Sequence, residues 1–236
     1  MTVQAIVYTA QPEQWRALVA ALGMAALGES SDKWEEHAAH GLLAIHGAEA
    51  DSGKAGNTEV HLLVDDFDGL IRTLGTGGFA HSMEDSEGVG RVVVAHDAQG
   101  VVISASEDDR SHTDGPLVVM PLQFTPDVEG ATKLYEAFGL KSRIKANAGG
   151  WADFTADGGG MTALHHDDTV RLGLTFEYGG NVEELASRLH NSGYESVIVD
   201  EAYNRTLQVK TPDRGMLWIA EVQQDLYGYS LVSAVE

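Results

Sequence analysis

The sequence predicts an α+β fold made by tandem duplication, with strands and helices in the same order in each half of the 236-residue chain. A short apolar strand that begins at glycine and ends at histidine occurs twice, at Gly41–Gly47 and at Gly160–His166. The equivalent histidines, His46 and His165, are separated by 165 − 46 = 119 residues, about half of the chain. Similarity at such an offset is typical of a duplicated architecture.

The first half is predicted to contain a strand, a helix and further strands, followed by the same series of elements once more. Residues 2–8 are rich in β-branched side chains and predict a strand, and Pro12 begins a helix that ends at Gly23. Strands follow around Trp34 and at 41–46. The second round consists of an alternating strand at 59–64, a helix capped by an aspartate of 65–68 and ended by Gly77–Phe79, and strands at 91–96 and 101–105.

The second half repeats this order after a charged, turn-rich segment. Its elements are a strand at 117–125, a helix begun by Pro126 and Asp127 and ended at Gly139, strands at 151–154, 161–165 and 171–178, a helix from Asn181 to Gly193, and a last strand at 216–222. We therefore predict a first domain at 1–107, a linker at 108–116, a second domain at 117–225 and a tail at 226–236.

Composition excludes several classes of function. The formal net charge of −21 repels phosphate backbones and anionic lipid, so we expect neither nucleic-acid nor membrane binding. The absence of cysteine excludes thiolate nucleophiles and leaves His, Asp and Glu as metal ligands. The N-terminus lacks a basic region followed by a long apolar run, so we expect no signal peptide and a soluble, cytoplasmic protein.

Three motifs, in a constant order, carry a family resemblance. They are the strand-to-helix junction Val64–Leu70, the helix-ending glycine turns Gly77–Phe79 and Ser192–Tyr194, and the turn Thr211–Gly215 before the last strand. Together they resemble the vicinal oxygen chelate superfamily of glyoxalases, bleomycin-resistance proteins and extradiol dioxygenases. The resemblance implies glyoxalase-like domains, each with two βαβββ modules whose curled mixed sheets form a cupped cavity.

The resemblance also implies where a metal ion would bind. In metal-dependent members, side chains on the first and last strands of the modules, usually His and Glu, hold a divalent ion in the cup. At those positions the first half offers His46, Glu59 and His61, and the second half offers only His165. A catalytic site normally needs three protein ligands and an open position. We therefore expect no cofactor and no metal, and keep the three first-half residues as fallback ligands for a divalent metal.

Polar side chains on the predicted concave faces are the candidates for a ligand pocket. Alternation places Val60, Leu62 and Val64 toward the helices and leaves Glu59 and His61 on the concave side. Trp218 falls at a position where the resemblance implies a metal ligand, and its indole supplies instead a flat apolar wall suited to a planar ligand. The full set of candidates is His46, Glu59, His61, His165, Arg171, Thr175 and Trp218. Both strand-end histidines are equally open to a purely structural role, and no catalytic residue is assigned.

The leading hypothesis is a glyoxalase- or bleomycin-resistance-like protein that binds a small, partly aromatic molecule in a cup without a catalytic metal. One alternative is a metal-dependent lyase, isomerase or dioxygenase of the same superfamily. Another is a non-catalytic scaffold or regulatory module. Because the duplication lies in one chain, we expect the domains to pair within it and the protein to be a monomer.

Overall fold

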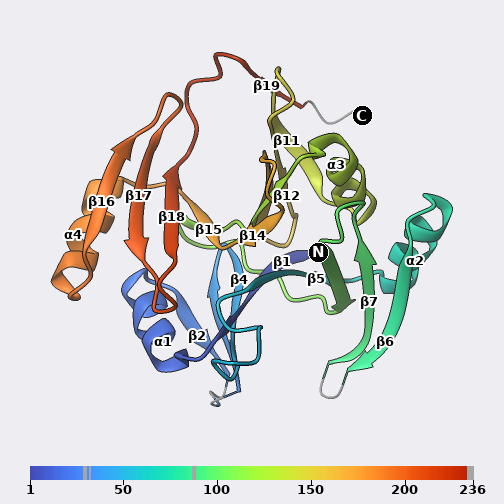
Figure 1. Ribbon diagram of the computed structural model, residues 1–236, viewed down its shortest axis with the longest axis horizontal. Coiled ribbons are helices and arrows are strands. Elements are labelled where there is room, and N and C mark those ends of the chain that lie inside the picture. The colour runs from blue at the N-terminus through green and yellow to red at the C-terminus, as the bar shows by residue number, and fades with distance from the viewer. Residues whose placement is uncertain (29–30, 32, 87–88, 233–236) are drawn as a thin grey trace.

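The computed structural model describes residues 1–28, 31, 33–86 and 89–232, and it consists of mixed β-sheets with helices packed on their outer faces (Figure 1). The elements of the first half are β1 (Thr2–Thr9), α1 (Pro12–Ala21), β2 (Ala25–Leu27), β3 (Trp34–Ala39), β4 (Gly41–Gly47), β5 (Thr58–Val64), α2 (Phe67–Thr76), β6 (His81–Ser86), β7 (Gly90–His96) and β8 (Val102–Glu107).

The second half repeats these elements, with two of the strands each divided in two, and adds one strand. Its elements are β9 (Leu117–Val119), β10 (Leu122–Thr125), α3 (Val128–Ala137), β11 (Lys141–Ala146), β12 (Trp151–Thr155), β13 (Met161–His166), β14 (Arg171–Gly173), β15 (Thr175–Tyr178), α4 (Val182–Asn191), β16 (Ser196–Asp200), β17 (Arg205–Lys210), β18 (Met216–Glu221) and β19 (Tyr229–Leu231). The extra strand, β19, lies in the segment expected to be a tail.

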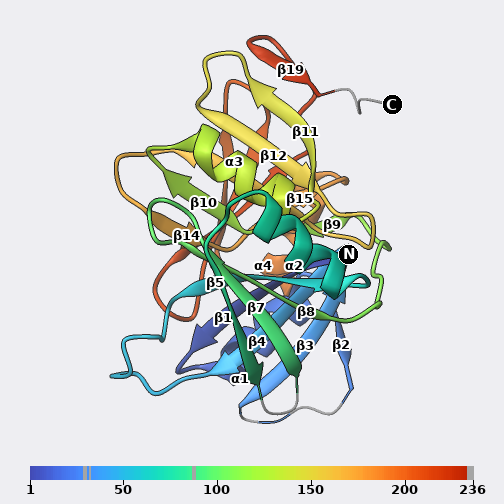
Figure 2. The ribbon, with the colours of Figure 1, turned by 90° about the vertical axis from the view of Figure 1, so that its right-hand side faces the viewer.

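The strand order confirms the predicted α+β duplication. The first half forms one sheet in the order β2-β3-β4-β1-β5-β8-β7-β6. In the second half the same order is divided between two sheets, β14-β10-β13-β12-β11-β19 and β16-β17-β18-β15-β9. The division arises because two central strands are interrupted, one of them at Pro121, which has no N–H to donate to a neighbouring strand. The sheets stay open and are not strongly curled, unlike the sheets that the resemblance implies (Figure 2).

Local sequence explains where the helices begin. The Asp66 side chain accepts a hydrogen bond from the Gly69 N–H at 2.8 Å, and Asp127 makes the same bond with Gly130, so each aspartate caps its helix. Asn181 caps α4 through the Glu183 N–H at 2.7 Å. These caps lie where the sequence predicts them.

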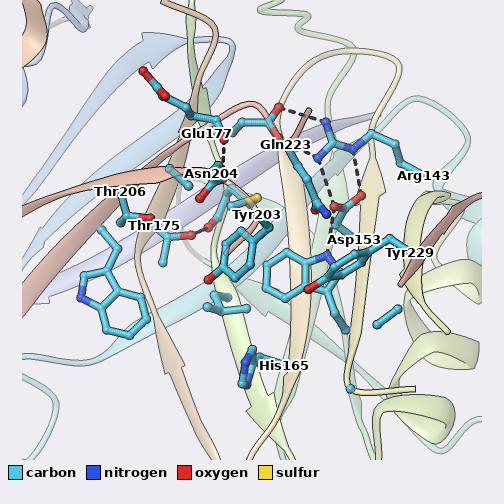
Figure 3. Close-up of a pocket in the computed structure, with 18 of the residues that line it drawn as sticks. Arg143, Asp153, His165, Thr175, Glu177, Tyr203, Asn204, Thr206, Gln223 and Tyr229 are labelled. Carbon is cyan, nitrogen blue, oxygen red and sulfur yellow. Dashed lines mark hydrogen bonds and ion pairs between the residues drawn. The ribbon is translucent and has the colours of Figure 1, made fainter. Parts of the chain in front are cut away.

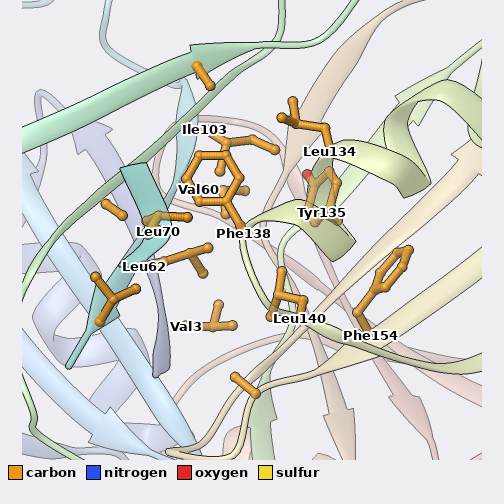
Figure 4. Close-up of a cluster of buried hydrophobic side chains, with 14 of the residues drawn as sticks. Val3, Val60, Leu62, Leu70, Ile103, Leu134, Tyr135, Phe138, Leu140 and Phe154 are labelled. Atoms are coloured by element: carbon orange, nitrogen blue, oxygen red, sulfur yellow. The ribbon is translucent and has the colours of Figure 1, made fainter. Parts of the chain in front are cut away.

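Two hydrophobic cores hold the molecule together, and each contains side chains from both halves. One core joins α2 and β5 to α3 and β12, with Leu62 and Leu70 of the first half in the same cluster as Tyr135 and Phe154 of the second (Figure 4). The other joins α1 to α4, β15 and β18, and includes Trp15 and Phe176. Neither half therefore buries its apolar surface alone. The domain boundaries expected from the sequence, at residues 107 and 117, remain predictions.

Glycines of the repeated strand motif meet at the junction between the halves. Gly41 and Gly160 have φ values of +92° and +83°, and a Cβ on Gly41 would lie 2.7 Å from the Cα of Gly160. Only glycine allows both this left-handed conformation and this close approach. Next to this contact, the Gly160 N–H donates to His40 Nδ1 at 2.9 Å.

Turns between the last two strands of each half also reach across to the other half. Asp213 accepts hydrogen bonds from Trp15 Nε1 at 2.5 Å and from Thr9 Oγ1 at 2.8 Å. In the equivalent turn of the first half, Asp97 accepts from Gln123 Nε2 at 2.5 Å. The two contacts are related by the duplication and fix both cups relative to each other. In the part of the chain that the structure describes, no helix is long and apolar enough to cross a membrane.

Candidate functional site

Each half carries one cup on the face of its sheet opposite the helices. The first cup is a cavity of about 830 Å³ lined by residues of β1, β5 and β8 together with the start of the following linker. Alternation along the strands places the side chains of Gln4, Glu59, His61 and Ser104 in this cavity. Val60, Leu62 and Val64 face the other way and pack in the hydrophobic core.

His61 lies at the base of the first cup with both ring nitrogens in hydrogen bonds. Its Nδ1 is 2.8 Å from Ser104 Oγ, and its Nε2 is 2.9 Å from Ser106 Oγ. The side chain is 6% exposed, and this burial lowers its pKa to about 4. The ring is therefore neutral at pH 7, with one nitrogen donating and the other accepting.

The other first-cup candidates lie near the mouth of the same cavity. Glu59 accepts a hydrogen bond from the Tyr8 hydroxyl at 2.8 Å. The pKa of Tyr8 is raised, mainly by burial and secondly by the Glu59 carboxylate. His46 packs edge-on against Tyr8 and Trp34, and its pKa is lowered, first by burial and then by Lys54. His46, Glu59 and His61 thus share one cavity.

An ionic network closes one side of the first cup. Arg110, from the linker, donates to Glu36 at 2.6 Å and to Asp108 at 2.7 Å, and the hydrogen bond with Glu36 is the first cause of its raised pKa. Gln4 donates from Nε2 to the same glutamate at 2.6 Å. Linker residues are therefore part of the cup wall.

The second cup is a smaller cavity of about 340 Å³ with aromatic walls (Figure 3). Apart from the fully buried Phe176, its aromatic lining consists of Trp151 on β12, Tyr203 in the loop before β17, Trp218 on β18 and Tyr229 on β19. The C-terminal segment thus contributes to this site. Trp218 is 40% exposed, so its ring offers free apolar surface to a ligand.

A buried ionic network lies at one end of the second cup. Arg143 donates from Nε and Nη2 to Asp153 at 2.9 and 3.0 Å, and from Nη1 and Nη2 to Glu177 at 3.0 and 2.7 Å (Figure 3). Asp153 also accepts from Trp151 Nε1 at 3.1 Å and from the Ile144 N–H at 3.1 Å. One guanidinium thus serves two carboxylates, and its pKa is raised by them against the opposing effect of burial.

The second-half candidates fall into two groups. His165, Thr175 and Trp218 line the second cup. Thr175 donates its hydroxyl to the Met120 carbonyl, which leaves it little freedom to bind anything else. Arg171 is not among the lining residues of this cavity, because its guanidinium lies 3.5 Å over the Phe124 ring and is paired with Asp167 at 2.7 Å.

Several residues of the second cup were not identified from the sequence. Arg143 and Asp153 lie on neighbouring strands, β11 and β12, whose pairing includes a bulge, and Tyr229 lies in the presumed tail. A signal for Asp153 was present, since the alternation that turns Trp151 toward the cup turns the residue two positions later the same way. Nothing in the sequence near Arg143 indicated its partners.

The arrangement resembles solved dioxygenases across almost its whole length. A catechol 2,3-dioxygenase matches with a TM-score of 0.64 and 13% identity over 98% of this chain and 95% of its own. Homoprotocatechuate 2,3-dioxygenase from Arthrobacter globiformis matches at 0.64 and 14%, over 94% and 79%. A halotolerant catechol dioxygenase matches at 0.60 and 12%, over 99% and 88%. No family model and no curated protein matches the sequence.

These matches show the fold and correct one expectation. The chain has the fold of the extradiol dioxygenases of the vicinal oxygen chelate superfamily. The narrower likeness to glyoxalases and bleomycin-resistance proteins is not supported by them. The expectation of no cofactor is wrong for this fold, because the matched dioxygenases belong to its metal-dependent branch. A metal ion is therefore the cofactor that the fold implies.

The residues of this chain do not fit such an ion at the positions that the resemblance implies. In the first cup, pairing aligns Gln4 with His61 and His61 with Ser104 across β1, β5 and β8. In the second, Thr175 is aligned with Trp218. Glutamine, serine, threonine and tryptophan side chains are poor ligands for a catalytic divalent ion. Among the described residues, no group of three or more His, Asp or Glu side chains could hold a metal.

Proposed function

We propose that this protein, which shares its fold with the extradiol dioxygenases, binds a small, planar, partly aromatic molecule in its second cup. The observation that carries the proposal is the ring of four aromatic side chains around a cavity of about 340 Å³. Such a cavity has the size and composition of known small-molecule sites, which are mainly apolar with a few polar groups that orient the ligand. Flat rings on several sides favour a flat ligand.

Two polar groups are available to orient that ligand. Asn204 lines the cavity, and within the described residues its buried Oδ1 has no hydrogen-bond partner. Thr206, on β17, lines the same wall. A bound molecule with a hydrogen-bond donor would satisfy the asparagine oxygen, which otherwise costs about 1–3 kcal/mol when buried and unpaired.

Titration by intrinsic tryptophan fluorescence tests this proposal, because two tryptophans line the cavity. Catechol and related monocyclic aromatics are added to the full chain, and binding is expected to change the emission of Trp218. Trp218→Ala is expected to weaken binding by about tenfold, equivalent to about 1.4 kcal/mol. Tyr227→Ala is the matched control, since this tyrosine is 92% exposed and lies outside the cavity. Equal effects of the two substitutions would count against the site.

A second candidate is a metal-dependent lyase, isomerase or dioxygenase of the same superfamily, with His46, Glu59 and His61 as the metal ligands. The fold comparison favours it more directly than it favours simple binding, since the matched structures are dioxygenases. The shared cavity of the three residues also supports it. Two observations stand against it: both His61 nitrogens are engaged by serine hydroxyls, and the three side chains do not form a group that could hold a metal ion as they are placed in the described residues.

Elemental analysis of untagged protein, combined with oxygen uptake in the presence of catechol, separates the two candidates. If the protein is a metal-dependent enzyme, we expect one equivalent of iron or manganese per chain, which is lost in His61→Ala, and oxygen consumption that depends on catechol. Substoichiometric metal after growth in supplemented medium, with no oxygen consumption, would reject it. If no aromatic compound binds either cup, the scaffold or regulatory alternative is the one that remains.

A further inference from the structure

We infer that the ligand of the second cup is an organic cation, an aromatic ring carrying an ammonium group. This inference rests on the proposed function and adds the charge of the ligand to it. Three features of the second cup support it: the net charge of its lining, the hydrogen bonds already made by its one arginine, and the aromatic surface around it.

The ionisable lining of the second cup has a net negative charge. Arg143 contributes one positive charge, and Asp153 and Glu177 contribute two negative charges. Glu221 also lines the cavity, but Arg205 neutralises it through bonds of 2.7 and 3.0 Å. Counting Arg, Asp and Glu alone, with Glu221 neutralised, the lining has a formal net charge of −1, although Arg143 is hydrogen-bonded to both Asp153 and Glu177. One arginine therefore balances two carboxylates, and a cationic ligand would offset the remaining net negative charge, whereas an anionic ligand would add to it.

Arg143 has little capacity left to bind an anion. A guanidinium has five N–H donors, and four hydrogen bonds already join Arg143 to Asp153 and Glu177. A carboxylate ligand would find one free N–H and two carboxylates beside it. Like charges at that range repel one another strongly where water is excluded. The arginine thus holds the two acidic residues in place and does not serve as an anion receptor.

The remaining polar and aromatic lining also favours a donor with positive charge. Asn204 offers an unpartnered acceptor oxygen, which suits an ammonium N–H. Trp151, Trp218, Tyr203 and Tyr229 present aromatic rings around the cavity, and the faces of such rings attract cations. The whole-chain charge of −21 attracts cations toward the surface in the same sense.

Three probes of nearly equal shape test the charge of the ligand: 2-phenylethylamine, 2-phenylethanol and 3-phenylpropionate. Binding of each to the full chain is measured by calorimetry at pH 7 in low salt and again in 0.5 M salt. We expect the amine to bind at least tenfold more tightly than the carboxylate, with the alcohol between them. Added salt is expected to reduce this preference, because it screens charges. Equal binding of all three, or preference for the carboxylate, overturns the cation inference and leaves the proposed function standing. No binding by any of the three refutes the proposed function itself.

A charge-neutralising variant assigns the preference to the cup. Glu177→Gln keeps an acceptor for Arg143 and removes the net negative charge, so we expect about fivefold or greater loss of amine binding with the alcohol unchanged. Glu184→Gln, on the exposed face of α4, changes the charge of the chain by the same amount far from the cavity. A loss in both variants, or in neither, contradicts the assignment. Alcohol binding by Glu177→Gln reports that its cup is still folded.

Discussion

Replacing Arg143 with methionine removes the cation that pairs with Asp153 and Glu177 at one end of the second cup. The side chain keeps most of its length, while the carboxylates of Asp153 and Glu177, 1% and 9% exposed, stay out of water without a cation beside them. Breaking a buried ion pair in this way typically costs about 3–5 kcal/mol. We expect a loss of that size in the free energy of unfolding at pH 7, measured by urea denaturation with far-UV circular dichroism.

The loss should depend on pH in a defined direction. A buried carboxylate without a cation is less costly once it is protonated, so acid should relieve part of the penalty in the variant. The penalty is therefore expected to shrink as pH falls, since the folded variant then takes up protons. At pH 4.5 we expect the difference between Arg143→Met and the unaltered protein to fall below half of its value at pH 7.

Lys133→Met is the matched control, because Lys133 pairs with Glu129 on the surface of α3, where the two side chains are 64% and 85% exposed. Exposed pairs contribute about 0–1 kcal/mol, so little change is expected. A loss below 1 kcal/mol for Arg143→Met at pH 7, or an equal loss at both pH values, would refute the account of a buried network.

Three further outcomes are expected. The pKa of His61 is about 4 in the folded protein and 6.5 ordinarily, so its contribution to stability is complete above pH 6.5 and is lost as pH falls toward 4. In urea titrations across that range, His61→Gln should remove about 3 kcal/mol of this pH dependence. Gly160→Ala should cost about 2–4 kcal/mol, because its Cβ would lie 2.6 Å from that of Val3, whereas Gly149→Ala, with φ +78° and open space, should cost about 1 kcal/mol. Light scattering should give a monomer mass near 25.2 kDa, and a stable dimer would contradict the expectation of pairing within one chain.

Local chemistry made much of the fold predictable. The helix beginnings at Asp66, Asp127 and Asn181 depend on side chains beside them, and alternation in β5 separates core from cup. Short edge strands were not recognised, because β2 and β6 are largely exposed and carry no apolar alternation to reveal them. Strong curling of the sheets was expected from resemblance and is not observed.

The site was less predictable because it depends on contacts distant in sequence. Arg143 reaches Glu177 across 34 residues and two sheets, a contact that no local pattern encodes. Tyr229 enters the second cup only because β19 pairs with β11. Counting candidate ligands predicted a chain without a cofactor, whereas the fold implies a metal. That expectation was wrong because it was drawn from the residues alone. The fold matches dioxygenases, whereas the described residues include no group of three or more His, Asp or Glu side chains that could hold a metal ion.

The sharing of each core between the halves has a consequence for synthesis. When the first half emerges from the ribosome, Phe67 and Leu70 of α2 can pack on first-half strands but lack the side chains of α3 and β12. Trp15 and Leu18 of α1 likewise lack those of α4 and β18. Contacts between residues so far apart in sequence form slowly. The nascent chain therefore carries apolar surface until nearly all of it has been made, and we expect its yield in cells to depend on chaperones that cover such surface.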